Sequence, residues 1–270
     1  MPPHPRARQS RSSHPIARAA ETERPDASAT SLRKICPQHA GLHNRGVERA
    51  IVLLSGGLDS AVCLALAREQ GLACSCLAFD YGQRHRVELA FARRQAELQQ
   101  AAEFTLIQID PAAFHGASAL TGGGEVPKAN VLEPGIPVTY VPARNAVFLA
   151  YALAKAEAWG AASLWIGVNA LDYSGYPDCR PEFIDAFARM ANLATKVGTE
   201  GAGLRIEAPL QHLTKRQIVE EALRTGVDLR YTTSCYDPGP GGEPCGGCEA
   251  CVLRTRGFAE AGAADPLITT

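Results

Sequence analysis

The fold of this chain is decided by residues 50–60, which read Ala50-Ile51-Val52-Leu53-Leu54-Ser55-Gly56-Gly57-Leu58-Asp59-Ser60. The first five residues form a short apolar run, typical of a strand buried in a parallel sheet. A helix-forming segment with apolar residues at 62, 64, 65 and 66 follows the glycines and ends at Gly71, and residues 72–79 form a second apolar run. The stretch therefore predicts a strand–helix–strand unit with a glycine turn after its first strand.

The same alternation of strands and helices continues along the chain. The pattern predicts a helix over 84–102, a strand over 104–109, a helix over 144–159 and a strand over 163–168. Strands that alternate with helices indicate an α/β fold with a doubly wound parallel sheet. The segment 111–142 is rich in glycine and proline, which predicts a long loop of the kind that often binds ligands.

Composition and charge narrow the class of protein. Hydrophobic residues make up 46% of the chain and charged residues 20%, as in an average soluble globular protein. The 27 basic and 28 acidic residues nearly cancel, so we expect no direct binding of nucleic acid. No apolar run approaches the roughly 18 residues that span a bilayer, and the N-terminus lacks an apolar signal core. We therefore expect a cytoplasmic protein with no membrane partner.

The glycine turn has the composition of a phosphate-binding loop. Paired glycines let backbone N–H groups approach an anion, and the N-terminus of the following helix adds partial positive charge. Ser55 and Ser60 offer hydroxyl donors, whereas Asp59 is negative and calls for a Mg²⁺ ion between itself and a phosphate. The alternative is an ordinary helix start capped by Asp59 or Ser60. We predict that the nucleotide is bound by Leu54, Ser55, Gly56, Gly57, Leu58, Asp59 and Ser60.

Four cysteines cluster near the C-terminus: Cys235, Cys245, Cys248 and Cys251. Four thiolates suit a tetrahedral zinc ion, and a site with four protein ligands is closed to substrate, so we predict one structural zinc per chain. An iron–sulfur cluster or a redox pair are the alternatives. Cys63, Cys74 and Cys76 lie in apolar elements and are expected in the core.

Three regions follow from these patterns. Residues 1–48 are rich in Pro, Ser, Arg and His and are predicted to be a disordered extension. Residues 49–230 are predicted to form the ATP-binding α/β domain. Residues 231–270 are predicted to form a zinc-binding segment that packs on this domain.

Several polar segments follow predicted strands, where binding loops of such sheets lie. They read Asp80-Tyr81-Gly82-Gln83-Arg84-His85, Val141-Pro142-Ala143-Arg144-Asn145 and, over 167–180, Gly-Val-Asn-Ala-Leu-Asp-Tyr-Ser-Gly-Tyr-Pro-Asp-Cys-Arg. Together with the glycine turn, residues 209–215 and the cysteine segment, they closely resemble the 7-cyano-7-deazaguanine synthase family of the PP-loop ATP pyrophosphatase superfamily. The resemblance covers about residues 50–258.

This resemblance implies a Rossmann-like fold of the adenine nucleotide alpha hydrolase type and an ATP-dependent carbon–nitrogen ligase. Members of the family convert 7-carboxy-7-deazaguanine and ammonia to the nitrile precursor of queuosine. The reaction passes through an adenylated carboxylate and an adenylated amide, consumes ATP as co-substrate and releases AMP and pyrophosphate. The resemblance also implies a homodimer.

Position and resemblance together give candidate roles. The candidate catalytic residues are Asp59, Ser60 and Lys215, and Lys215 is expected to neutralise the leaving group unless it is an ordinary exposed lysine of the helix over 216–225. Arg144 at a helix start is unfavourable beside the helix dipole, which indicates an anionic ligand. The candidate substrate-binding residues are Arg84, His85, Arg144, Asn145, Asp172, Asp178 and Arg180. The alternative is turn capping for Asp172, Asp178 and Arg180, and an exposed helix start for Arg84 and His85.

One position departs from the family pattern. The family commonly has glycine where Ala143 stands, and if the turn needs a positive φ there, alanine costs about 1 kcal/mol. Two other functions stay open at this point: a PP-loop enzyme that thiolates tRNA, and a non-catalytic zinc module that binds ATP.

Overall fold

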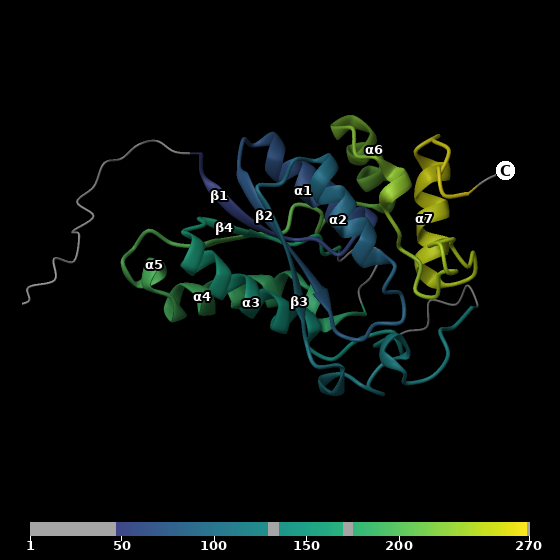
Figure 1. Ribbon diagram of the computed structural model, residues 1–270, viewed down its shortest axis with the longest axis horizontal. Helices are drawn as coiled ribbons and strands as arrows, with labels where there is room; N and C mark the ends of the chain where they lie inside the picture. The colour runs from purple at the N-terminus through teal and green to yellow at the C-terminus, as the bar shows by residue number, and fades with distance from the viewer. Residues whose placement is uncertain (1–46, 129–134, 170–174, 269–270) are drawn as a thin grey trace, which may run out of the picture. The chain divides into compact units, whose positions relative to one another are not determined.

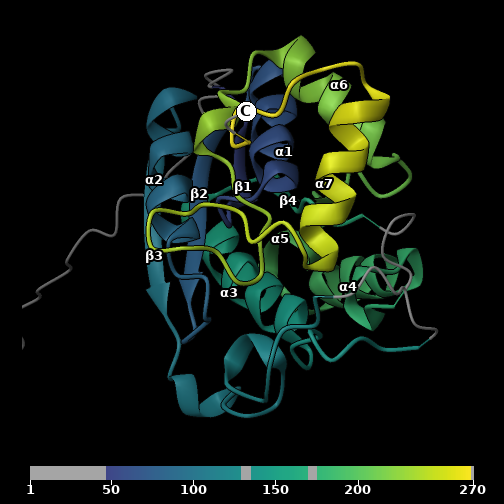
Figure 2. The same ribbon diagram turned by 90° about the vertical axis from the view of Figure 1, so that its right-hand side faces the viewer.

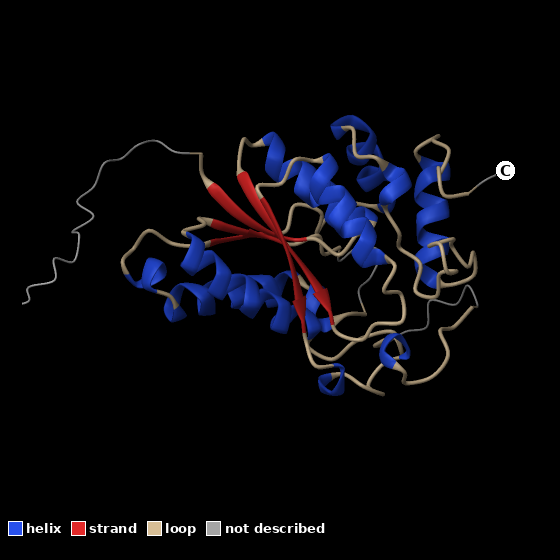
Figure 3. Ribbon diagram, in the orientation of Figure 1, coloured by secondary structure: helices blue, strands red, loops and turns tan. Residues whose placement is uncertain are grey.

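The structure is a computed structural model that describes residues 47–128, 135–169 and 175–268. Its centre is one parallel sheet of five strands in the order β3-β2-β1-β4-β5 (Figure 3). The strands are β1 (Arg49–Leu53), β2 (Ala73–Asp80), β3 (Glu103–Gln108), β4 (Ser163–Trp165) and β5 (Arg205–Glu207). The chain builds from β1 toward β3 and then crosses to β4 on the other side of β1, so the strand order reverses beside β1. Ligands of such sheets bind at this switch point, beyond the carboxyl ends of the strands.

Helices cover both faces of the sheet (Figure 1). Helices α1, α2 and α6 lie on one face with α7 beside α6, and α3, α4 and α5 lie on the other, as the view in Figure 2 also shows. The helices are α1 (Leu58–Glu69), α2 (Glu88–Leu98), α3 (Arg144–Trp159), α4 (Pro181–Ala194), α5 (Lys196–Thr199), α6 (Lys215–Thr225) and α7 (Glu249–Glu260). The described helices and strands therefore form the predicted doubly wound α/β fold.

Two hydrophobic cores lie on the two faces of the sheet. Side chains of β1 alternate between them, with Ile51 and Leu53 in the core under α3 and Val52 and Leu54 in the core under α1 and α6. All four are at most 8% exposed. Burial on both faces explains why the strand is a continuous apolar run rather than an alternating one. Cys63, Cys74 and Cys76 lie in the second core, which confirms their expected place.

The predicted elements are confirmed except at some of their ends. The helix predicted over 84–102 spans only Glu88–Leu98, so Arg84 and His85 lie in a turn before α2. The strand predicted over 163–168 ends at Trp165, because Gly167 turns out of the sheet against the start of α1, where a Cβ would lie 2.9 Å from the Asp59 carbonyl carbon. Helices α4, α5 and α7 and strand β5 were not predicted. The buried positions of α4 nevertheless recur at helical spacing, at Ile184, Phe187 and Ala191.

The remaining described segments also bear on the predictions. Within 111–142, the described residues form only two short 3-10 turns, at Pro111–Ala113 and Ala119–Thr121, which agrees with the predicted loop. None of the helices in the described part of the chain combines the length and apolar character that a membrane span requires. The predicted disordered extension lies outside the described residues except for its last two positions, and the boundary at residue 230 stays a prediction.

Helix α7 docks the C-terminal segment on the sheet domain. Gly257 of α7 lies against Lys215 at the start of α6, where an added Cβ would approach the Lys215 Cγ to 2.6 Å. Arg254 of α7 is buried and forms a two-pronged ion pair with Asp265, with N···O distances of 2.6 and 2.9 Å. Its third nitrogen donates to the hydroxyl of Thr232 at 3.0 Å. These contacts fix residues 232–265 beside the first turn of α6.

Candidate active site

The loop between β1 and α1 requires glycine at its centre. Gly56 has a φ of +87°, and a Cβ there would lie 2.1 Å from the carbonyl oxygen of Glu88 in α2. Gly57 is the N-cap of α1, and no side chain caps this helix. The sequence alternative of a helix start capped by Asp59 or Ser60 is therefore wrong. The amide groups of the first turn remain available to an anion.

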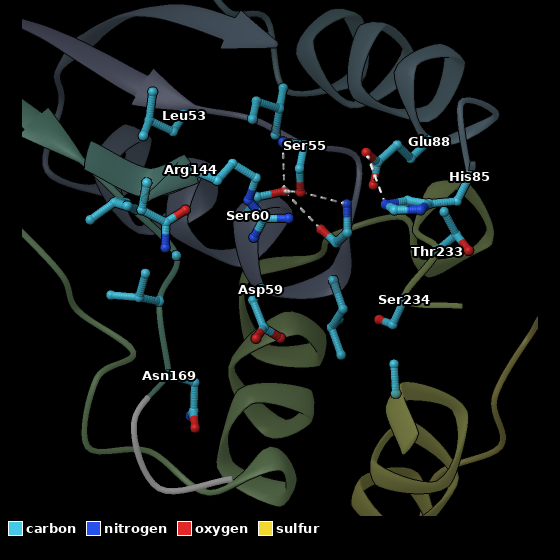
Figure 4. A pocket seen from close by; sticks show the side chains of 18 of the residues that line it. Leu53, Ser55, Asp59, Ser60, His85, Glu88, Arg144, Asn169, Thr233 and Ser234 are labelled. Carbon is cyan, nitrogen blue, oxygen red and sulfur yellow. Dashed lines mark hydrogen bonds and ion pairs between the residues drawn. The ribbon is translucent and has the colours of Figure 1, made fainter. Parts of the chain in front are cut away.

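Two serine hydroxyls hold the shape of this loop (Figure 4). The Ser60 Oγ donates to the Gly57 carbonyl oxygen at 2.9 Å and accepts from the Ser55 backbone N–H at 3.2 Å. The Ser55 and Ser60 hydroxyls also contact each other at 3.2 Å. From the C-terminal segment, the Thr233 N–H donates to the Gly56 carbonyl oxygen at 3.0 Å. The loop is thus built both from its own residues and from a segment far along the chain.

Asp59 and Lys215 form an ion pair at the edge of the loop. The Lys215 Nζ donates to both carboxylate oxygens of Asp59 at 2.9 Å. The Asp59 side chain is 25% exposed and the Lys215 side chain 13%. Lys215 is the first residue of α6, which begins with a capping box at Thr214. The alternative of an ordinary exposed lysine is therefore wrong. The Asp59 charge, which by sequence alone called for a cation, is balanced by Lys215.

A cavity of about 270 Å³ opens at the carboxyl ends of β1, β2 and β4. Figure 4 shows side chains around it from the glycine loop, α2, α3 and the C-terminal segment. The predicted site residues that line it are Leu54, Ser55, Gly57, Leu58, Asp59, Ser60, His85, Arg144, Asn145, Lys215 and Cys235. Gly56, Arg84, Asp178 and Arg180 do not line it. The fold thus brings most of the candidates from five separate segments into one cavity.

An aromatic wall, formed by Phe79 and Phe148, and the Arg144 guanidinium also line the cavity. Phe79 and Phe148 stack with ring centroids 4.0 Å apart and planes 6° apart. The Arg144 Nη1 donates to the Tyr81 hydroxyl at 3.1 Å, and within the described residues no carboxylate pairs with this arginine. Arg144 therefore offers positive charge to the cavity beside rings that suit a flat heterocycle.

Asn145 and Asp178 organise the start of α3. The Asp178 Oδ2 accepts the Asn145 backbone N–H at 2.9 Å, and the Asn145 Nδ2 donates to the Asp178 carbonyl oxygen at 3.0 Å. The Asp178 carboxylate thus caps a helix whose own N-cap, Ala143, provides no side-chain bond. Ala143 has φ 52° and ψ 22°, so the turn has the positive φ at which alanine is less favourable than glycine.

Besides Asp178, two of the predicted substrate residues, Arg84 and Arg180, do not line the cavity. Arg84 donates to the Gly124 carbonyl oxygen at 3.0 Å and lies 3.9 Å from an Asp237 carboxylate oxygen. Arg180 is exposed and donates to the Pro177 carbonyl oxygen at 3.3 Å. Asp172 lies outside the described residues. A direct role for Arg84 or Arg180 at the cavity finds no support in these contacts.

His85 is buried rather than exposed, so the alternative of an exposed helix start is wrong for this residue. It is 6% exposed, and its Nε2 lies 3.4 Å from the Glu88 Oε1. The sequence prediction missed Glu88, which also lines the cavity, although its position three residues after His85 at a helix start signals a contact. Other lining residues that it missed are Tyr81, Phe148, Tyr176, Cys179, Thr233 and Ser234.

The four predicted cysteines converge on one point. The sulfur atoms of Cys235, Cys245, Cys248 and Cys251 all lie within 4.8 Å of one another, and all four are free thiols. The Sγ separations of Cys248 from Cys251 and Cys235 are 3.5 and 4.0 Å. Sulfurs held about 2.3 Å from a tetrahedral ion lie roughly 3.8 Å apart, so the cluster fits a metal of that geometry. The backbone N–H groups of Asp237 and Cys245 donate to the Cys235 Sγ at 3.4 and 3.2 Å, which suits a thiolate.

A parallel α/β sheet with an uncapped glycine loop at its switch point defines the chain as an α/β protein with a PP-loop-like fold, whose loop is suited to bind an anion. Comparison with known families is more specific. The chain belongs to the family described as Queuosine biosynthesis protein QueC, whose model matches residues 49–262.

Relatives with curated names agree with the family match. The chain is 57% identical over 225 residues to 7-cyano-7-deazaguanine synthase of Rhizorhabdus wittichii. The matched region covers 83% of this chain and 97% of that protein. It is 58% identical to the enzyme of the same name from Thiobacillus denitrificans, over 80% of this chain and 96% of that protein. The resemblance seen in the sequence is thereby confirmed, and the thiolating and non-catalytic alternatives are not favoured.

Solved structures give a much weaker match. NMN synthetase from Francisella tularensis superposes with a TM-score of 0.41 at 19% identity, over 84% of this chain and 91% of that one. Similarity this low has no bearing on the function.

Proposed function

We propose that this chain converts 7-carboxy-7-deazaguanine, ammonia and ATP to 7-cyano-7-deazaguanine, AMP and pyrophosphate. The observation that supports it best is the uncapped glycine loop, which opens into a cavity that also contains the Arg144 guanidinium. An anion-binding loop and a separate cationic group in one cavity are what a nucleotide and a carboxylate substrate require.

The chemistry explains why ATP is needed. A carboxylate is a poor electrophile because its leaving group would be oxide, so its oxygen is first joined to the α-phosphorus of ATP. Ammonia then displaces AMP from the acyl adenylate to give the amide. A second adenylation, on the amide oxygen, followed by loss of AMP gives the nitrile, so two ATP are consumed per product.

The residues around the loop fit the nucleotide half of this reaction. Residues 54–60 would hold the pyrophosphate through the α1 amides and the two serine hydroxyls. Lys215 would offset charge on the departing pyrophosphate, and Asp59, which contacts Lys215 on the same side of the loop, would help to hold a Mg²⁺ ion that supplies further positive charge. Attack would then fall on the α-phosphorus.

The aromatic wall and the Arg144 guanidinium fit the second substrate. The Arg144 guanidinium would pair with the carboxylate of the deazaguanine before adenylation. Its flat ring system would lie against the Phe79 and Phe148 wall. Asn145 would act through its contact with Asp178, which fixes the first turn of α3 and thereby the position of Arg144.

The cysteine cluster is proposed to hold one structural zinc ion. Four thiolate ligands close the coordination sphere, so the ion would stabilise the C-terminal segment rather than activate water. Cys235 belongs both to the cluster and to the cavity wall, so the ion would also fix one side of the site. We further propose a homodimer that works in the cytoplasm.

The test is direct incubation of the purified protein with 7-carboxy-7-deazaguanine, ammonium, Mg²⁺ and ATP. Mass spectrometry should detect the nitrile, with about two AMP formed per nitrile. Omission of ammonium should stop nitrile formation. Formation of ADP instead of AMP, or AMP without nitrile in the complete mixture, would contradict the proposal.

A further inference from the structure

We propose that His85 is the base that takes protons from the substrate nitrogen during amide and nitrile formation, with Glu88 as its positioning residue. The inference deepens the proposed function and rests on it. It assigns the proton acceptor that both nitrogen-dependent steps require.

The first observation is a buried imidazole nitrogen without a partner. His85 lines the cavity, is 6% exposed, and its Nδ1 has no hydrogen-bond partner within the described residues. Leaving a buried polar atom unpaired is unfavourable by roughly 1–3 kcal/mol, so such an atom calls for an explanation. His85 thus brings to the cavity wall a buried nitrogen that no described residue occupies.

The second observation is the carboxylate that lies beside the other ring nitrogen. The Glu88 Oε1 lies 3.4 Å from the His85 Nε2, on the side of the ring marked by the dashed line in Figure 4. The carboxylate favours the tautomer with the proton on Nε2, which leaves the lone pair on Nδ1. Nδ1 is then a proton acceptor, and the carboxylate stabilises the imidazolium that forms.

The position of Glu88 is itself fixed by a buried amide. Gln83 is 1% exposed, and its Nε2 donates to the Glu88 Oε1 at 3.1 Å and to the Phe79 carbonyl oxygen at 2.9 Å. Its Oε1 accepts the Tyr81 N–H at 2.9 Å. This series of contacts connects the end of β2 to the His85 ring through Gln83 and Glu88. It restricts the direction in which the His85 Nδ1 points.

Other titratable groups around the cavity are less suited to this role. Asp59 is paired with Lys215, and Cys235 belongs to the metal cluster. Burial raises the pKa of the Cys179 thiol to about 12, and burial also raises the pKa of the Tyr81 and Tyr176 hydroxyls, so all three stay protonated near neutral pH.

The proposed steps balance as follows. In the first, the ammonia nitrogen bonds to the acyl carbon, the bond from that carbon to the AMP oxygen breaks with its electron pair leaving on AMP, and one N–H proton passes to the His85 Nδ1. In the second, the adenylated amide loses its nitrogen proton to Nδ1 as the carbon–oxygen bond to AMP breaks. The nitrogen electron pair then completes the nitrile. Neither step consumes an oxidant or reductant.

The test separates adenylation from proton removal. Adenylation is measured as carboxylate-dependent exchange of labelled pyrophosphate into ATP, and amide formation by mass spectrometry in a single turnover. His85→Gln should keep exchange within about threefold of wild type but lower amide formation at least about 100-fold. Glu88→Gln should show a smaller loss in the same step, and His115→Gln, at an exposed histidine away from the cavity, should match wild type.

Two further readouts distinguish a base from a structural residue. Hydroxylamine is unprotonated at neutral pH and is a stronger nucleophile than ammonia, so the His85→Gln protein should still form the hydroxamate from the adenylate. Added imidazole should restore amide formation in a His85→Ala protein. These results would support the inference.

Other results would overturn it. Amide formation at the wild-type rate in His85→Gln would show that His85 is not the base. Loss of pyrophosphate exchange in the same variant would make His85 a nucleotide- or substrate-binding residue instead. Absence of pyrophosphate exchange in the wild-type protein would refute the proposed function itself. This outcome is distinct from failure of the His85 inference, because it is seen without any variant.

Discussion

The Lys215 ammonium lies 2.9 Å from both carboxylate oxygens of Asp59, although 156 positions separate the two residues. Asp59 is in the first turn of α1 and Lys215 in the first turn of α6, and these two helices pack together on one face of the sheet. The pair thus joins the glycine loop to the start of a helix that follows the last strand.

Removing either member of this pair should abolish adenylation. Asp59→Ala and Lys215→Ala should each lower AMP formation at least about 100-fold, because a fixed charge beside the reacting phosphates is lost. The double variant should be no less stable to urea than either single variant, since each single change leaves a partly buried charge unpaired. Lys196→Ala, which removes a lysine that is 77% exposed on α5, is the control and should leave turnover unchanged. Full turnover in Asp59→Ala would remove this carboxylate from the mechanism.

Arg144 should determine affinity for the carboxylate substrate. Arg144→Gln removes the charge and the donor, so the KM for 7-carboxy-7-deazaguanine should rise roughly 10- to 100-fold, the range expected for a hydrogen bond to a charged group. The KM for ATP should change far less. The matched control is Arg189→Gln on the exposed side of α4. An equal rise in both KM values would instead place Arg144 at the nucleotide.

The cysteine cluster should hold about one zinc per chain by elemental analysis. Cys245→Ser should lose the metal and lower the melting temperature, because the C-terminal segment loses a ligand that crosslinks it. Cys74→Ala, at a buried cysteine of β2 outside the cluster, should keep the metal. Iron in place of zinc would reopen the possibility of sulfur chemistry.

Ala143→Gly should stabilise the protein. Ala143 has a φ of 52°, which is unfavourable for a residue with a Cβ, so glycine should raise the free energy of unfolding by up to about 1 kcal/mol. The comparison is Ala154→Gly, at an exposed position inside α3, which should lower it by about 1 kcal/mol. Urea denaturation measures both. A loss of stability at both positions would mean that the turn does not store this strain.

Cys179 should make stability fall at alkaline pH. Burial raises the pKa of its thiol from 9.0 to about 12, with the charge of Asp178 adding to the effect. Between these values the unfolded chain releases the proton and the folded chain keeps it, so the free energy of unfolding decreases as pH rises through this window. Urea titrations from pH 8 to 11 should show a steeper decline for wild type than for Cys179→Ala. If the free energy of unfolding fell equally with pH in wild type and in Cys179→Ala, the thiol would ionise equally in the folded and unfolded states.

Local patterns were enough to predict most of the fold. The apolar run before Ser55 and the glycine pair that follows it predicted a buried parallel strand and its anion loop, because burial on two faces and a tight turn act over a few neighbouring residues. The four cysteines were predicted as a cluster because three of them lie within seven positions. The missing family glycine drew attention to the backbone at Ala143, where the structure has a positive φ.

Contacts between distant segments could not be predicted in this way. The sequence favoured neither burial nor exposure for Lys215, and it called for a cation beside Asp59. It could not predict that these two residues pair, because no local pattern brings α6 to α1. Asp178 was a candidate for substrate binding, and only the approach of residues 177–179 to the start of α3 makes it a helix cap.

The sequence by itself determined the class of sheet, the glycine loop, the cysteine cluster and the family, since each depends on residue types at short, fixed spacing. Only the tertiary structure decided which charges face one another and which are left unpaired. It paired Asp59 with Lys215 and left Arg144 without a carboxylate partner among the described residues. It also buried His85 beside Glu88, with the Nδ1 atom lacking a hydrogen-bond partner among those residues. The physical reason is that charge pairing and burial depend on distances through space, which the packing of helices on the sheet sets.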